Sequence, residues 1–164
     1  MPRAPRVSLE EAADRVSAYV YGNILLLAAL VVLSEDDVDH GTGIAIVVGT
    51  AVSTFIAHAF SESLGSAVRG GEHSSLRTIL RDSVPILSAS TVPAALMLVG
   101  TTDLLSAGPC LRLAEGWVVS RMALTAFFVG RLQGRPVTIR TWLASALLAG
   151  SALAVVAVKV VLTH

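Results

Sequence analysis

Polar residues recur at four-residue intervals inside an apolar stretch of this 164-residue chain. From Thr50, every fourth position carries a polar side chain, namely Thr54, His58 and Glu62. Because residues four apart lie on one face of a helix, a helix over this stretch presents a partly ionisable stripe. Histidine changes charge close to neutral pH, so such a stripe is suited to proton transfer or to polar links between helices.

Arg121 is the polar residue in an apolar part of the sequence whose transfer into a membrane costs the most free energy. Measured from the basic end of the stretch 107–130, it lies ~14 Å along the helix axis at about 1.5 Å per residue. A charge at that depth in a membrane costs about 2.5–3.5 kcal/mol on insertion scales, so we expect a partner. The candidates are Glu62 or another polar group of the stretch 41–65.

We therefore predict a polar cluster in the half of the membrane next to the cytoplasm. Its members are Asn23, Thr54, His58, Glu62 and Arg121. A purely structural cluster, which only holds helices together, is the alternative interpretation.

Metal and cofactor chemistry are not predicted. His58 and Glu62 have the spacing of two metal ligands on one helix face, but two ligands do not make a site. The single Cys110 excludes an internal disulfide and a cysteine-based metal cluster. The chain has no Gly-x-Ser-x-Gly, no His-Glu-x-x-His and no phosphate-binding loop with lysine, so catalysis is not predicted either.

Small residues also repeat every four positions in the stretch 41–65. They are Gly41, Ala45, Gly49, Ser53, Ala57, Ser61 and Gly65. Small side chains let helix backbones approach closely within a bilayer, so this groove predicts a packing surface. Ala146, Gly150 and Ala154 repeat the same spacing near the C-terminus. The groove therefore packs against that later segment, or it binds a second copy or a partner membrane protein.

The elements that position these residues follow from the composition, which is 54% hydrophobic and 15% charged. A bilayer-spanning helix needs about 20 predominantly apolar residues, and in lipid only helices satisfy the backbone of such segments. We predict one all-α membrane domain, 1–164, built as a polytopic transmembrane helix bundle. Its five spans are 16–34, 41–65, 83–102, 107–130 and 137–162.

The arginines predict the orientation of the bundle. Arginines precede the first span and lie in the connections near 69–81 and 131–140. The connections 35–40 and 101–110 contain no Lys or Arg. Cytoplasmic connections are the basic ones, so the N-terminus is expected in the cytoplasm and the C-terminus outside. With this orientation, the acidic segment 35–40 is predicted to be a solvated loop on the outer side of the membrane. The expected location is the bacterial cytoplasmic (inner) membrane. The expected partner is the lipid bilayer, and binding to nucleic acid is not predicted.

Two segments, Val20–Leu30 and Phe55–His58, resemble small, uncharacterised integral membrane proteins of GC-rich bacteria. The resemblance covers the first two spans and implies a membrane location without an activity. Two functions stay open. A membrane accessory or assembly subunit without its own catalysis fits the small size and the groove. A minimal oligomeric transporter or channel for an ion or small solute fits the polar residues inside the spans and a helix-kinking Pro93.

Overall fold

The structure, a computed structural model, describes residues 9–68, 76–102 and 104–132, together with isolated helical positions between 139 and 157. Over the described residues the chain is helical and has no strand, which confirms the all-α prediction. The helices are α1 (Leu9–Val32), α2 (Glu35–Asp39), α3 (Thr42–Val68), α4 (Leu76–Gly100) and α5 (Ala107–Leu132).

Three stretches of these helices are long and apolar enough to cross a membrane: Asp14–Val32, Thr42–Gly65 and Arg77–Gly100. They overlap the first three predicted spans. The fourth predicted span forms a single helix of 26 residues, α5, which is not among these three stretches of the described residues and carries Arg112, Glu115 and Arg121 along its length. The fifth, 137–162, lies outside the described residues except for isolated helical positions.

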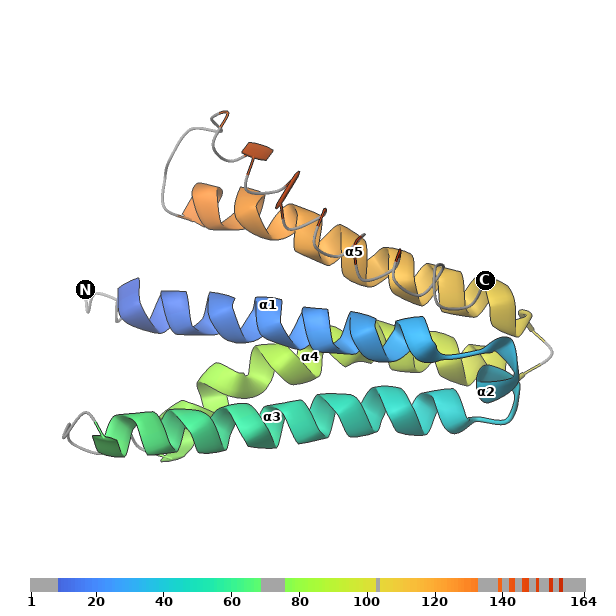
Figure 1. The fold of residues 1–164 in the computed structure, drawn as a ribbon, viewed down its shortest axis with the longest axis horizontal. Helices are drawn as coiled ribbons and strands as arrows, with labels where there is room; N and C mark the ends of the chain where they lie inside the picture. The colour runs from blue at the N-terminus through green and yellow to red at the C-terminus, as the bar shows by residue number, and fades with distance from the viewer. Residues whose placement is uncertain are drawn as a thin grey trace, which may run out of the picture.

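The helix α4 packs against each of the other long helices, with α1, α3 and α5 around it (Figure 1). The core between them is aliphatic. It includes Leu26, Leu27, Leu30, Val47, Met97, Val118 and Met122. Lipid tails are as apolar as leucine, so within a bilayer the close fit of these side chains, rather than escape from water, favours the packing.

Two kinds of residue adapt α4 to its central place. At Gly22 of α1, an added Cβ would lie 3.1 Å from the Ile86 Cα, so only glycine allows the two backbones this approach. Pro85 and Pro93 both lie inside α4, where each removes a backbone hydrogen bond and bends the helix. The ribbon of α4 changes direction along its length in Figure 1.

The acidic segment 35–40 is solvated as expected, with Glu35, Asp36, Asp39 and His40 exposed, but it is not a loop. It forms the short helix α2, whose Val38 is fully buried and belongs to the core. Val38 lies so close to Gly100 that a Cβ added at Gly100 would overlap it. The chain then turns into α3 through Gly41, whose φ of +77° lies in the left-handed region that favours glycine. One apolar side chain therefore anchors an otherwise polar helix to the end of the bundle.

The contact between Val38 and Gly100 predicts the effect of a single methyl group. We expect Gly100→Ala to destabilise the protein by about 1–3 kcal/mol through overpacking, measured by denaturant unfolding in detergent with circular dichroism. Gly116→Ala is the matched control, since nothing lies within 4 Å of a Cβ added there. Adding Val38→Ala to Gly100→Ala should recover part of the loss. Equal stabilities of Gly100→Ala and Gly116→Ala would contradict the anchoring role of Val38.

Candidate functional site

The predicted polar cluster divides into two separate links around α4. On one side, His58 of α3 lies with its Nδ1 3.1 Å from the Oγ of Ser83 on α4. The Ser83 hydroxyl is buried and donates its single hydrogen to the Ile79 carbonyl at 2.9 Å. With that hydrogen on the Ile79 carbonyl, His58 Nδ1 carries a hydrogen and donates to Ser83 Oγ. This link joins α3 to α4.

On the other side, Arg121 of α5 bonds to α1 and α4. Its Nε donates to the Tyr19 hydroxyl at 2.9 Å, and its Nη1 donates to the Ser88 carbonyl at 2.8 Å. A longer contact of 3.4 Å joins Nη2 to Ser88 Oγ. The guanidinium carbon also lies 4.7 Å from the centre of the Tyr19 ring, within cation–π range.

The expectation that Arg121 finds its partner on the 41–65 segment is therefore wrong. Within the described part of the chain, its partners are neutral groups of the two other helices. A carbonyl and a phenol accept hydrogen bonds from a guanidinium as a carboxylate does, but they carry no negative charge to balance its positive charge. Glu62 is partly buried near the end of α3 and is engaged in an interaction of its own.

Asn23 is fully buried one helical turn from Tyr19. Its Nδ2 donates to the Tyr19 carbonyl at 2.7 Å, whereas its Oδ1 has no hydrogen-bond partner among the described residues. Thr54 is buried on α3, and no described hydrogen bond of its side chain joins His58 to Arg121. The structure thus places Asn23 beside the Arg121 link, through Tyr19, and leaves His58 in the other link.

An ion pair that the sequence analysis missed completes this half of the bundle. Arg15 Nε donates to Asp82 Oδ1 at 2.7 Å, and both side chains are partly buried. The information was present, because Arg15, Tyr19 and Asn23 are spaced four residues apart. The rule applied to residues 50–62 therefore also predicts a polar stripe on α1.

The small-residue groove lies on the outside of the described bundle. Ala45, Gly49, Ser53, Ala57 and Ser61 are exposed, and nothing lies within 4 Å of a Cβ added at Gly49. The two ends, Gly41 and Gly65, are partly buried. Ala146, Gly150 and Ala154 are exposed as well, so the described positions do not pack against the groove.

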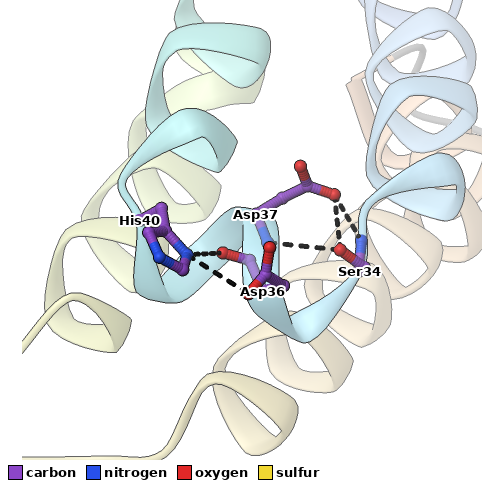
Figure 2. Close-up of polar contacts among 4 residues, drawn as sticks. All are labelled: Ser34, Asp36, Asp37 and His40. Carbon is purple, nitrogen blue, oxygen red and sulfur yellow. Dashed lines mark hydrogen bonds and ion pairs between the residues drawn. The ribbon is translucent and has the colours of Figure 1, made fainter.

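A different polar arrangement caps the opposite end of the bundle, at α2 (Figure 2). Ser34 Oγ accepts from the Asp37 backbone N–H at 3.2 Å, and the Asp37 carboxylate accepts from the Ser34 backbone N–H at 2.9 Å. These bonds form a capping box. The Ser34 hydroxyl also donates to the Asp37 carboxylate at 2.6 Å, and this bond, together with the one from the Ser34 backbone N–H, lowers the pKa of Asp37. His40 Nδ1 donates to the Asp36 carbonyl at 2.9 Å, and this bond together with the nearby carboxylates raises the pKa of His40.

Among the described residues, no three His, Cys, Asp or Glu side chains are placed to hold a metal ion. An open depression of about 470 Å³ lies beside α2 and contains one carboxylate. Its lining residues are Asp39, Gly100, Thr101, Thr102, Leu105 and Ser106. The polar chemistry of the described bundle is therefore that of hydrogen bonds and ion pairs between helices.

No protein-family model, curated protein or solved structure matches this chain. The function therefore has to be argued from the residues themselves.

The orphaned oxygen of Asn23 predicts a stabilising substitution. Since a buried acceptor without a partner costs about 1–3 kcal/mol, more than the one bond that Asn23 makes, we expect Asn23→Leu to stabilise the protein by about 1 kcal/mol. Unfolding in detergent measures the change, with Asn23→Asp as a control that should destabilise it. Destabilisation by Asn23→Leu would show that Oδ1 has a partner such as a buried water.

The cap of α2 predicts a pH window. The lowered pKa of Asp37 stabilises the cap above the ordinary value of 3.8, and this contribution is lost as the pH falls through the lowered pKa. The raised pKa of His40 stabilises it below the ordinary value of 6.5, and this contribution is lost as the pH rises through the raised pKa. The protection of the α2 amides from exchange, relative to their intrinsic exchange rate at each pH, should therefore be greatest between the two shifted pKa values.

Ser34→Ala tests the cause of the Asp37 shift. We expect it to return the Asp37 pKa toward 3.8 in an NMR titration, because the hydroxyl that donates to the carboxylate is lost. It should also speed amide exchange in α2, because the oxygen that caps the Asp37 backbone N–H is lost. The His40 pKa is the internal control and should stay raised. An unchanged Asp37 pKa in Ser34→Ala would contradict the capping box.

Proposed function

We propose that this protein is a small polytopic integral membrane protein that acts as an accessory or assembly subunit without catalysis of its own. In this proposal it associates with a second copy or with a partner membrane protein through the α3 face. We define the α3 face as the exposed small residues Ala45, Gly49, Ser53, Ala57 and Ser61.

The observation that carries the proposal is the exposure of α3. Of its membrane-length stretch, 22% is buried within the bundle, against 39% for the corresponding stretches of α1 and α4. A helix in a bilayer gains from a neighbour chiefly through close backbone packing, which small residues allow. The α3 face has that composition and no neighbour among the described residues, so it is suited to a helix from another protein or another copy.

The proposed topology has five spans, with the N-terminus in the cytoplasm and the C-terminus outside, in the bacterial inner membrane. It is supported by the alternation of basic and non-basic connections along the sequence. The contacts of the two arginines within the predicted span of α5 also support it. Arg121 is held by Tyr19 and Ser88, and Arg112 lies at the other end of α5, with its Nη1 3.9 Å from a Glu35 carboxylate oxygen.

The alternative, a minimal transporter or channel, has less support. A transport pathway needs polar side chains that line one route through the bundle. His58 and Arg121 lie in two separate links, one between α3 and α4 and the other between α5, α1 and α4, so they do not line a shared route. We therefore prefer the accessory function.

A pair of glycine substitutions tests the α3 face. Gly49 and Gly116 are both exposed glycines inside helices, and nothing lies within 4 Å of a Cβ added at either. Leucine at each position should leave the protomer intact. We expect Gly49→Leu to weaken association by about tenfold, since helix contacts in membranes are worth about 1–2 kcal/mol, whereas Gly116→Leu should not change it.

Two measurements follow the association. Copies carrying different tags are co-expressed and co-purified in mild detergent, and the mass of the purified assembly shows whether a second copy or another membrane protein is bound. Retention of the full assembly by Gly49→Leu would contradict the proposal. An equal loss in both variants would also contradict it, because the α3 face would then have no special role.

A further inference from the structure

The positive charge of Arg121 is not neutralised by any carboxylate in the described parts of the chain. Its hydrogen-bond partners are a phenol, a backbone carbonyl and a hydroxyl. Other arginines of the bundle differ, since Arg15 is paired with Asp82 and Arg112 lies opposite Glu35. A guanidinium held among neutral groups in a medium of low dielectric constant attracts an anion strongly.

The same residues retain unused hydrogen-bond donors. A guanidinium has five N–H groups, and the described contacts of Arg121 use three of them. The Tyr19 hydroxyl accepts from Arg121 Nε, and no described contact uses its own hydrogen. Arg121 is partly exposed and Ser88 is exposed, so an anion reaches these donors from outside the bundle.

The surroundings favour an amphiphile over a free ion. Val84 on α4 lies one helical turn from Ser88 and is 51% exposed. Leu124 on α5 lies three residues after Arg121 and is 50% exposed. Tyr19 lies five residues from the start of the stretch Asp14–Val32, and Ser88 lies five residues from the start of the predicted span 83–102. At about 1.5 Å per residue, both partners of Arg121 therefore lie about 8 Å from the ends of these spans, within reach of a lipid headgroup. A phosphate carried by a lipid enters such a place together with acyl chains that cover the apolar residues, whereas a free phosphate does not.

We propose that Arg121, assisted by the Tyr19 hydroxyl, binds the phosphate of an anionic phospholipid between α1, α4 and α5. The guanidinium supplies the charge and two N–H donors, and the phenol supplies a third donor. This inference rests on the proposed membrane location, but it does not depend on the α3 face.

Native mass spectrometry of the full chain tests the lipid site. The protein is purified in detergent and offered phosphatidylglycerol or phosphatidylcholine at equal concentrations. We expect the wild type to retain the anionic lipid about tenfold better, since a charge-assisted hydrogen bond is worth about the free energy of a tenfold change. Arg121→Gln should abolish the preference. Arg112→Gln, which removes the same charge from the same helix, should keep it.

Tyr19→Phe gives a second test that does not depend on the folding of Arg121→Gln. It keeps the ring under the guanidinium and removes the hydroxyl, which is both the proposed donor to the phosphate and the acceptor of Arg121 Nε. The preference should therefore fall about threefold, in line with a neutral hydrogen bond. Equal retention of both lipids by the wild type would overturn the proposal. Equal losses in Arg121→Gln and Arg112→Gln would overturn it too, because the effect would then be one of net charge alone.

An arm with inorganic phosphate distinguishes the source of the anion. If phosphate without lipid raises the melting temperature of the wild type but not of Arg121→Gln, and anionic lipid does not, the lipid assignment is overturned. Membrane fractionation of the same variants separates this inference from the proposed function. Wild-type protein that is recovered from the membrane but shows no lipid preference would overturn only the inference. Wild-type protein that is absent from the membrane would overturn the proposed function.

Discussion

The helix α4 supplies one polar partner to each of the three long helices around it. Asp82 accepts from Arg15 of α1, Ser83 bonds to His58 of α3, and Ser88 accepts from Arg121 of α5. Apolar packing alone distinguishes poorly between neighbours in a bilayer, because lipid competes equally well for apolar side chains. These three links have partners of fixed position, so they specify which helix lies beside which face of α4.

The backbone of α4 is shaped for the same central place. Gly22 lets α1 approach Ile86 closely, and the two prolines bend α4 along its length. At the other end of the bundle, Val38 of α2 fills the space that Gly100 leaves. Small residues at the contacts and polar pairs between helices together replace the hydrophobic driving force that holds a water-soluble core.

Hydropathy was sufficient to predict the helices and the three apolar stretches, because length and apolar character directly determine whether a helix crosses a bilayer. It did not predict α2, since five of the six residues of 35–40 are polar and Val38 is the only indication of burial. The spacing of Ser34 and Asp37 is nevertheless typical of a helix start. The partners of Arg121 were also missed, because the expectation considered polar groups of the stretch 41–65, whereas the partners lie on α1 and α4 and one of them is a backbone carbonyl, which has no signature in a sequence.

The polar stripe of α1 shows what sequence periodicity can and cannot give. The spacing of Arg15, Tyr19 and Asn23 predicts that they share a face, but it does not say which helix that face meets. Arg15 bonds to α4 and Tyr19 to α5, although they lie one turn apart. The choice depends on how α4 and α5 are placed, and that placement comes from contacts distant in sequence.

The central position of α4 also has a consequence for biogenesis. A ribosome makes α1 and α3 before α4, so Arg15 and His58 leave the exit tunnel before Asp82 and Ser83 exist. Until α4 arrives, the nascent chain carries these side chains without the partners of the finished protein. Arg121 comes last, when Tyr19 and Ser88 are already in place to receive it. The order of synthesis thus leaves the early helices dependent on water or on other molecules for their polar contacts until α4 is made.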